Sequence, residues 1–324
     1  MKLYEDYKVE YKFDSLLNLD KTIKELEKTN DKKISQEFGI LQEVENSEEN
    51  INRKYNKETK KNRYSDICPY KDEDKMVKLK NDNYINASWV NVSQCTKFLF
   101  KFPSIKFIAT QGPLEKTEED FWNMIVENKV SLIVMLCNLE ESNRVKCHQY
   151  WPNENKSKDF KLFTINHESE KNNKVIYERK FSVNYKDNKD EKFSVTQIHY
   201  TAWPDHGVPS LDKTYNHFET MFKYVSNEKV NPVAVHCSAG IGRTGTFMSS
   251  YKLWYEINKR YNYLKSIQDK SDGVDEQPDF KFSIFKTVLK AKDSRCHSVE
   301  NIKQYEFIYK LVKRFFNLIN NLIQ

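Results

Sequence analysis

The stretch that decides the fold of this 324-residue chain reads Val235-His236-Cys237-Ser238-Ala239-Gly240-Ile241-Gly242-Arg243-Thr244-Gly245-Thr246-Phe247. An apolar strand, Pro232 to Val235, precedes the cysteine, and a helix is expected to begin near Arg243. The small residues between them let successive backbone N–H groups turn toward one point and bind an anion. The start of the helix adds unpaired N–H groups and the positive end of its dipole. The stretch therefore predicts a strand, an anion-binding loop and a helix in succession.

Two side chains in this stretch predict chemistry. Cys237 lies at the floor of the loop, and five residues separate it from Arg243. A thiol among such donors is expected to ionise to the thiolate at neutral pH. A guanidinium can bind two oxygens of a tetrahedral oxyanion at once. Together they predict a phosphate-cleaving cysteine, because a structural cysteine at a strand end would not explain the glycines and Arg243.

These residues resemble the signature loop of the cysteine-dependent protein tyrosine phosphatases, His-Cys-X5-Arg-Ser/Thr-Gly. The longer match through Ala239, Gly240, Ile241 and Phe247 is similar to the phosphotyrosine-specific branch rather than the dual-specificity branch. The seven-residue core by itself also fits a lipid phosphatase or an arsenate reductase-like enzyme. The branch therefore depends on whether the family's other motifs occur in order along the chain.

Composition limits the class of protein. Hydrophobic residues make up 38% and charged residues 31% of the chain, which is enough for a sizeable core beneath a charged surface. The net charge of +6 comes with no nucleic-acid motif of interleaved basic and aromatic residues, so no nucleic-acid partner is expected. The histidines are isolated, and no metal or other cofactor is expected.

Cysteine usage and hydropathy indicate the compartment. The six cysteines show no CxxC spacing, which favours a reducing environment in which a catalytic thiol persists. The first residues lack the apolar segment of a signal peptide, and no apolar run is long enough to span a membrane. We expect a cytoplasmic protein without a transmembrane segment.

The N-terminal part is polar and favours helices. Residues 1–50 predict two or three helices, followed by a charged, solvated connector from Asn46 to Lys60. We divide the chain into an N-terminal helical extension, residues 1–35, and a phosphatase-like catalytic domain, residues 36–324. The resemblance itself covers roughly Phe38 to Phe316.

Further family motifs occur in order. Lys61 to Ile67 matches the phosphotyrosine loop, which implies that Tyr64 stacks on the substrate ring and makes the cleft too deep for phosphoserine. Asp66 is expected to accept hydrogen bonds from substrate backbone amides. The resemblance also implies that Glu141 pairs with Arg243, and that Lys146 is the basic residue near the general-acid loop.

Thr201 to Pro209 matches the family's Trp-Pro-Asp loop. The match implies that Asp205 is the general acid on a movable loop. It also implies that the aromatic residue Trp203 contacts the substrate.

The remaining pattern predicts alternating elements. A buried central strand is expected over Ser131 to Leu136, and antiparallel strands over Phe160 to Tyr200. Helices are expected from Glu118, from near Leu211, over Thr244 to about Lys259, over Phe280 to Ala291 and over Tyr305 to Gln324. Residues 261–277 are polar and are interpreted as an inserted surface loop. The last helix is expected to pack on the core, although its Lys310, Lys313 and Arg314 leave a membrane surface as an alternative.

One family motif is altered. The family pattern Gln-Thr-X-X-Gln-Tyr falls on residues 300–305, where Glu300 and Asn301 replace its first two residues and Gln304 is retained. The resemblance implies that Gln304, with or without Glu300, positions the hydrolytic water. A carboxylate beside a phosphoryl group costs about 3 kcal/mol per unit charge at roughly 5 Å, with an effective dielectric constant of about 20. His297 stands at a position that is often small in the family, and it is expected to narrow the cleft entrance.

The resemblance implies an α/β fold, a highly twisted mixed β-sheet flanked by helices, and hydrolysis of phosphotyrosine in proteins through a cysteinyl-phosphate. Cys237 attacks, Asp205 protonates the leaving oxygen, His236 tunes the thiolate and Thr244 assists its departure. Phosphate is expected to bind Arg243 and the loop residues, Ser238, Ala239, Gly240, Ile241 and Gly242. The alternatives are a phosphotyrosine-binding pseudophosphatase, which only Glu300 supports, and a dual-specificity or lipid phosphatase, which Tyr64 opposes.

Overall fold

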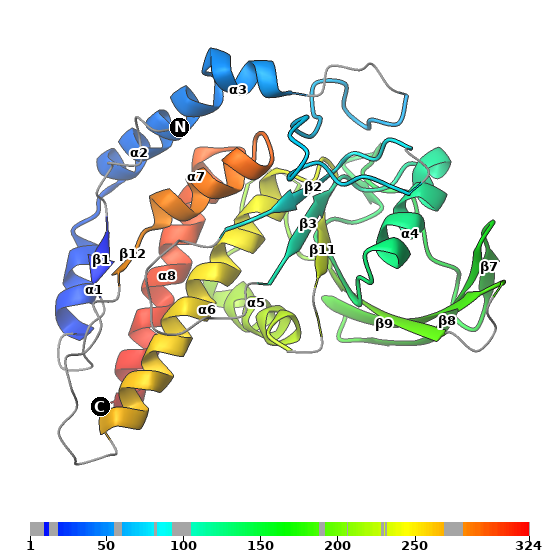
Figure 1. The fold of residues 1–324 in the computed structure, drawn as a ribbon. Coiled ribbons are helices and arrows are strands. Elements are labelled where there is room, and N and C mark those ends of the chain that lie inside the picture. Colours follow the sequence, from blue (N-terminus) through cyan, green and yellow to red (C-terminus); the bar gives the residue numbers. More distant parts are fainter. Residues whose placement is uncertain are drawn as a thin grey trace.

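The computed structural model describes residues 10–12, 19–54, 60–80, 83–92, 105–187, 192–205, 207–227, 230, 232–268 and 281–323. The largest sheet in these residues has eight strands in the order β2-β3-β11-β4-β10-β9-β8-β7, with two small two-stranded sheets beside it, β1-β12 and β5-β6. Helices cover both of its faces (Figure 1). The expected α/β fold with a mixed, twisted sheet is confirmed.

The centre of the sheet is parallel and buried. It consists of β3 (Phe107–Thr110), β11 (Val233–His236), β4 (Leu132–Met135) and β10 (Lys192–Tyr200). Every residue of β3, β4 and β11 is buried, as continuous apolar runs in a two-sided parallel sheet require. The predicted central strand at residues 131–136 is confirmed. Because β11 pairs with β3 on one side and β4 on the other, the loop that follows it starts from a firmly held strand end.

The two margins of the sheet are antiparallel. β10 pairs with β9 (Ile176–Tyr185), β9 with β8 (Phe163–Asn172) and β8 with β7 (Ser157–Asp159), which confirms the antiparallel strands expected between residues 160 and 200. At the other margin, β2 (Ala87–Val90) pairs with β3.

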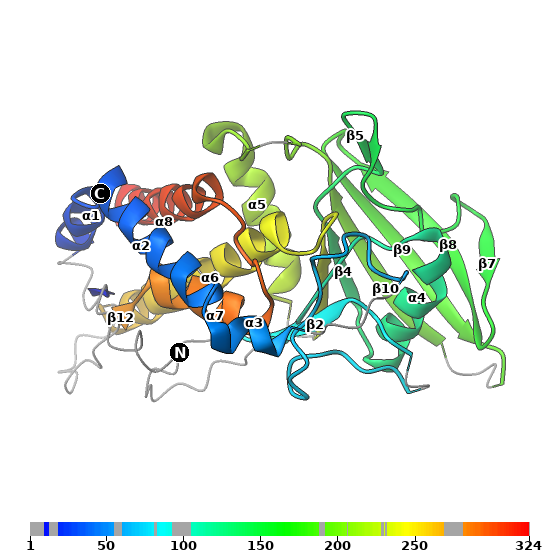
Figure 2. The ribbon, with the colours of Figure 1, turned by 90° about the horizontal axis from the view of Figure 1, so that it is seen from above.

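Aromatic side chains connect the helices to each face of the sheet. On one face, α4 (Glu118–Glu127), which follows the short helix η3 (Glu115–Thr117), places the ring of Trp122 against Phe181 of β9. On the other face, Phe218 of α5 (Leu211–Val225) contacts Tyr200 of β10. Figure 2 shows α6 (Gly242–Gln268), α7 (Ile284–Ser294) and α8 (Ile302–Ile323) gathered beyond α5 on that second side.

Two expectations for this helical side are wrong. Residues 261–268 continue α6 rather than beginning an inserted loop, because Leu264 is buried and Tyr261 and Tyr263 pack against the core. The rest of the expected loop, residues 269–277, lies outside the described residues. The next helix begins at Ile284 and not at residue 280, because the Ser283 side chain caps it by accepting a hydrogen bond from the Lys286 N–H.

The N-terminal helices wrap around this bundle. They are α1 (Leu19–Glu27), α2 (Asp31–Glu45) and α3 (Glu48–Arg53), and the short strand β1 (Tyr11–Lys12) pairs with β12 (Lys281–Phe282). Helix α2 runs continuously through residues 35 and 36. The solvated connector expected from residue 46 is wrong for its first part, since Ser47 caps α3 and Arg53 forms ion pairs with Asp72 and Asp293.

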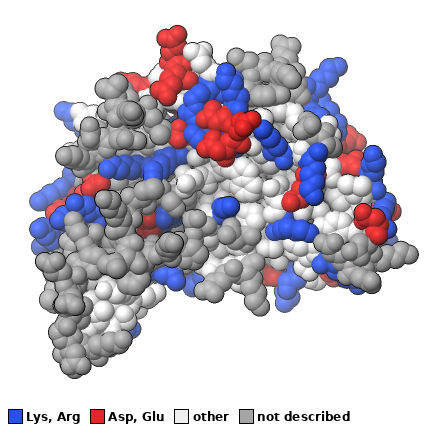
Figure 3. Space-filling model, viewed as in Figure 1, with Lys and Arg blue, Asp and Glu red and all other residues white. Residues whose placement is uncertain are grey.

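Helix α8 has a buried apolar stripe that contacts α1, α2, α5 and α6. Its packing on the core is confirmed, which removes the membrane-surface alternative for that stripe. Within the ranges that the structure describes, no helix combines the length and apolarity needed to cross a membrane. On the face drawn in Figure 3, basic and acidic side chains are interspersed and do not separate into one basic field.

The ring of Phe218 is the centre of the aromatic packing between α5 and its neighbours. It is fully buried and contacts five rings, those of Tyr200, Trp203, Phe222, Phe247 and Phe307.

Phe218→Ala should therefore lower the free energy of unfolding by about 3–5 kcal/mol, because it removes buried apolar surface and leaves a cavity. Urea unfolding followed by circular dichroism measures this change. Leu162→Ala is the control, since that side chain is 54% exposed and its loss should change stability by less than about 0.5 kcal/mol. Equal midpoints for the two variants would contradict the central role of Phe218.

Candidate active site

Cys237 lies where β11 ends, at the floor of a cavity of about 650 Å³. Its side chain is buried, and the Gly240 N–H donates to its Sγ atom at 3.3 Å. The residues that line the cavity include Tyr64, Asp66, Lys146, Asp205, Arg243 and Gln304, which come from distant parts of the chain. The fold thus brings most of the sequence-predicted site residues to one cleft.

Gly240 gives the loop its turn. Its φ of +71° is in the left-handed region, and a Cβ atom there would be 2.1 Å from the carbonyl oxygen of Thr110. Only glycine meets both conditions without strain.

Arg295 holds the loop from behind, and sequence analysis did not identify it. Its guanidinium is fully buried and donates to the carbonyl oxygens of Gly240 at 2.7 Å and Ala239 at 3.1 Å. It also donates to Asn86 and Ser88. Burial lowers the pKa of Arg295. Because these carbonyls point toward Arg295, the loop N–H groups are left for the cleft. No local sequence pattern could reveal this contact, because Arg295 lies 58 positions after Cys237.

Arg243 is held at the start of α6 by a carboxylate. Its two terminal nitrogens each donate to one oxygen of Glu141 at 2.7 Å. Glu141 ends β5 (Glu140–Glu141), which is folded back by β6 (Arg144–Val145). Arg243 also donates to the carbonyl oxygen of Leu136 at 3.0 Å. The bidentate pair fixes the plane of the guanidinium, as the resemblance implied.

Asp205 is ion-paired in this structure. Its Oδ1 atom is 2.7 Å from Lys146 Nζ and 3.7 Å from Arg243. The hydrogen bond from Lys146 holds the pKa of Asp205 well below its usual range. The carboxyl therefore rests as the carboxylate at neutral pH, and it would need an added negative charge nearby to bind a proton.

The loop that bears Asp205 is anchored by Trp203, whose expected substrate contact is wrong. The ring is 2% exposed and contacts Phe218 and Phe307, and its Nε1–H donates to the Gly207 carbonyl oxygen at 3.2 Å. Trp203 is not among the described residues that line the cleft. An apolar ring at this position is buried with the core because the loop crosses α5 and α8.

His236 lies beside Cys237 and forms a hydrogen bond with its main-chain carbonyl. Its Nδ1 atom is 3.1 Å from the Cys237 carbonyl oxygen, and its Nε2 atom is 2.9 Å from the Tyr150 hydroxyl. Burial lowers the pKa of His236 to about 4, so the ring is neutral near pH 7. Gln197 donates to the Tyr150 oxygen at 2.6 Å, which leaves Tyr150 as the donor to Nε2 and His236 as the donor to the carbonyl. His236 thus orients the backbone of Cys237.

Thr244 is buried, and its hydroxyl has no hydrogen-bond partner within the part of the chain that the structure describes.

Tyr64 lies at the cleft wall and is 38% exposed, and its hydroxyl is 2.9 Å from Ser238 Oγ. Asp66 lines the same cleft. Ser238 Oγ in turn donates to the Lys146 carbonyl oxygen at 2.9 Å.

Glu300 and Gln304 both line the cleft beside Gly242. The Glu300 N–H donates to Gln304 Oε1 at 2.8 Å. A Cβ atom on Gly242 would lie 2.7 Å from both Gln304 Nε2 and Glu300 Oε2, so the absent side chain makes room for these groups. His297 is not among the described cleft-lining residues, which makes the expected narrowing wrong; its ring faces Glu45 and Lys54.

No group of three or more His, Cys, Asp or Glu in the described ranges is arranged to hold a metal ion.

The fold and this cleft define a class of protein, and comparison with known proteins identifies it. The family model for "Protein-tyrosine phosphatase" matches residues 58–314. The chain is 34% identical over 258 residues to mouse tyrosine-protein phosphatase non-receptor type 4, covering 79% of this chain and 25% of that protein. It is 35% identical over 264 residues to mouse receptor-type tyrosine-protein phosphatase C, covering 79% and 18%.

A third relative, rat phosphatidylinositol phosphatase PTPRQ, is 33% identical over 261 residues, covering 78% of this chain and 10% of that protein. The chain thus spans a quarter or less of the length of these three relatives. The chain belongs to the protein-tyrosine phosphatase family.

Lys146→Met should raise the pKa of Asp205 toward the ordinary value of about 3.9, because loss of the cation favours the neutral carboxyl. The ¹³C shift of the Asp205 carboxyl, assigned with Asp205→Asn, reports the titration midpoint. Lys158→Met is the control, since Lys158 pairs with Glu118 outside the cleft. An unchanged midpoint in Lys146→Met would mean that Lys146 does not control Asp205.

Proposed function

We propose that the protein hydrolyses phosphotyrosine in proteins through a cysteinyl-phosphate intermediate. The observation that supports this most directly is a thiol at the floor of a 650 Å³ cleft with Arg243 and Asp205 on its walls. Family membership adds the expectation of a tyrosine phosphatase reaction, since the relatives carry that name. Since α2 runs through residues 35 and 36, the proposed catalytic domain includes the whole of this helix and does not begin at residue 36. A cytoplasmic location is proposed with it.

In the first step, Cys237 attacks the phosphorus and the tyrosyl oxygen leaves. The Gly240 N–H stabilises the thiolate, and Arg243 with the loop amides binds the equatorial oxygens. Asp205 must be protonated to act as the acid, although Lys146 favours its ionised form. A bound phosphate dianion supplies the opposing charge, so that substrate binding itself raises the proton affinity of Asp205.

Loop closure is coupled to the same arginine. Arg243 donates to the carbonyl oxygens of Pro204 at 3.2 Å and Asp205 at 3.4 Å. A guanidinium that contacts both the phosphate and this loop draws the acid toward the leaving oxygen.

In the second step, water attacks the cysteinyl-phosphate and Asp205 accepts its proton. Gln304 orients the water through Nε2, because its Oε1 atom already accepts the Glu300 N–H. Departure of the thiolate restores the Gly240 contact, and the unpartnered Thr244 hydroxyl is proposed to donate to it.

We propose that the depth of the cleft selects phosphotyrosine over phosphoserine. Tyr64 and Asp66 stand at the rim above the buried thiol, so an aryl phosphate is long enough to reach Cys237 while a phosphoserine is too short. The ring of Tyr64 is proposed to stack on the phosphotyrosine ring, and Asp66 is proposed to accept hydrogen bonds from backbone amides of the substrate.

The proposal is tested by measuring phosphate release from a phosphotyrosine peptide, a phosphoserine peptide and phosphoinositide vesicles. The wild type should act on the first far faster than on the others, and Cys237→Ser should lose turnover while still binding the phosphotyrosine peptide. Cys68→Ser, which replaces a buried cysteine outside the cleft, should keep its activity. Faster release from phosphoinositides would favour a lipid phosphatase, and peptide binding without release would favour a pseudophosphatase.

Glu300→Gln should raise kcat severalfold, because a carboxylate beside the phosphoryl group opposes attack on the intermediate. The rate of cysteinyl-phosphate formation should change little, since Cys237, Arg243 and Asp205 remain. Rapid acid quench separates the two steps. Glu306→Gln removes the same charge outside the cleft-lining set and serves as the control. Equal kcat values for wild type and Glu300→Gln would leave Gln304 as the single water-positioning residue.

A further inference from the structure

Helix α2 bears two buried carboxyl groups on the side that faces α7 and α8. Glu37 and Glu45 are eight residues apart, which is about 12 Å along a helix. Glu37 Oε2 accepts hydrogen bonds from the hydroxyls of Tyr305 at 2.7 Å and Tyr309 at 2.6 Å. It therefore holds the first turns of α8, which contain Gln304 and directly follow the loop that bears Glu300.

Glu45 holds the other end of the same loop. Its Oε2 atom is 2.8 Å from Lys292 Nζ, with exposed fractions of 6% and 3% for the two side chains. Its Oε1 atom accepts the backbone N–H of His297 and is 3.4 Å from His297 Nδ1. Burial opposes the charge, but the His297 hydrogen bond and Lys292 lower the pKa of Glu45 to about 2, so it is ionised.

The backbone between these anchors is in an unfavourable conformation. His297 and Val299 have φ values of +59° and +57°, in the left-handed region that L-residues avoid, above all a β-branched one. Contacts with the surroundings must therefore maintain it. Arg295 and Val299 are attached to the phosphate-binding loop through Gly240 and Ile241. Between them, the His297 N–H is held by Glu45.

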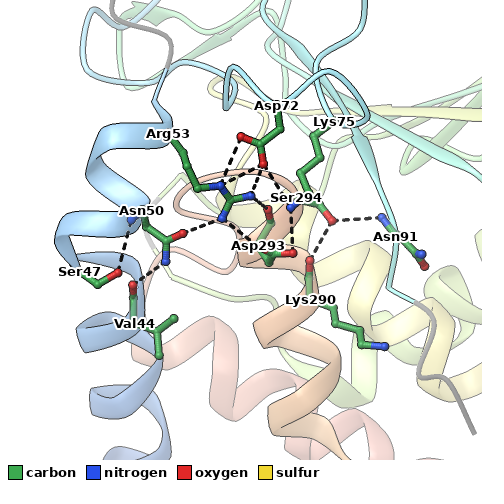
Figure 4. Close-up of polar contacts among 10 residues, drawn as sticks. All are labelled: Val44, Ser47, Asn50, Arg53, Asp72, Lys75, Asn91, Lys290, Asp293 and Ser294. Carbon is green, nitrogen blue, oxygen red and sulfur yellow. Dashed lines mark hydrogen bonds and ion pairs between the residues drawn. The ribbon is translucent and has the colours of Figure 1, made fainter. Parts of the chain in front are cut away.

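A second contact fixes the end of α7, where this loop begins. Figure 4 shows Arg53 of α3 between Asp72 and Asp293, and Lys75 also reaches Asp293. Arg53 donates to the Asp293 main-chain carbonyl as well, at 3.1 Å. The helices α2 and α3 thus contact the end of α7 at Lys292 and Asp293, and α2 contacts the loop at His297, although the family model matches the chain only from residue 58.

We propose that Glu45 is a positioning residue for hydrolysis of the cysteinyl-phosphate: by holding the His297 N–H and Lys292, it keeps the backbone of residues 297–300 in the conformation that places Glu300 and Gln304 beside Gly242. This role rests on the proposed function. It affects the second step more than the first, because Arg295 is held independently by Asn86, Ser88 and the loop carbonyls.

The test compares Glu45→Gln with the wild type on p-nitrophenyl phosphate. Glutamine has the size of glutamate but no charge, so it accepts weaker hydrogen bonds from Lys292 and from the His297 N–H. Steady-state kcat should fall about tenfold, while the rate of cysteinyl-phosphate formation in rapid acid quench should stay within about twofold of wild type. Phosphoenzyme should accumulate. Hydrogen–deuterium exchange of the peptide 296–304 should become faster.

Two further variants separate positioning from general stability. Glu256→Gln disrupts a comparably buried ion pair with Lys252 inside α6, and it should lower stability without changing the ratio of the two rates. Adding His297→Gly to Glu45→Gln should recover most of the lost kcat, because glycine adopts the left-handed conformation without strain.

The role of Glu45 is overturned if Glu45→Gln keeps the wild-type kcat, or if both steps slow equally, or if Glu256→Gln produces the same accumulation. Failure of His297→Gly to restore any turnover also overturns it. A wild type that forms no phosphoenzyme at all would instead overturn the proposed function.

Discussion

The site depends on a buried guanidinium, that of Arg295, beneath the loop that follows Cys237. Arg295 binds the carbonyl oxygens of Ala239 and Gly240, an amide oxygen of Asn86 and the Ser88 hydroxyl, all neutral groups within the described residues. Burying a cation without a carboxylate is costly, and the lowered pKa of Arg295 reflects this. The positive charge of Arg295 is compatible with an anion on the far side of the loop, where the proposed substrate phosphate would bind.

Around this loop, charges are arranged in pairs that substrate can alter. Arg243 is fixed by Glu141, and Asp205 by Lys146, so each of these two cations of the cleft is paired with a carboxylate. His236 remains neutral because it is buried, and it acts on the Cys237 carbonyl through a defined tautomer. Under the proposed function, a phosphate dianion that enters this cleft competes for Arg243 and raises the proton affinity of Asp205. The proposed mechanism therefore links substrate binding to acid catalysis.

The side of the cleft that bears Glu300 and Gln304 is supported in a different way. Glu300 and Gln304 follow a backbone with two left-handed non-glycine residues, and this segment is held by α2 through Glu45 at one end and Glu37 at the other. In the parallel sheet, by contrast, Cys237 follows a strand paired on both sides. The two sides of the cleft therefore depend on different supports, the central sheet for Cys237 and helix α2 for Glu300 and Gln304.

The sequence by itself determined the groups that are close along the chain. Cys237, the small residues and Arg243 occur within seven positions, so their strand, loop and helix follow from local rules. The same is true of the buried strand at 131–136 and of the helix at Leu211.

Only the tertiary structure decided the rest. Arg295 reaches the loop across 55 residues, Trp203 is buried because α5 and α8 enclose it, and His236 meets a carbonyl because Tyr150 occupies its other nitrogen. The extension of α6 through residue 268 and the helix α3 were likewise missed, because buried contacts outweigh a polar composition that favours loops. Local sequence patterns specify the helices, the strands and the kinds of reactive side chain. Contacts between distant segments decide which partner each side chain has.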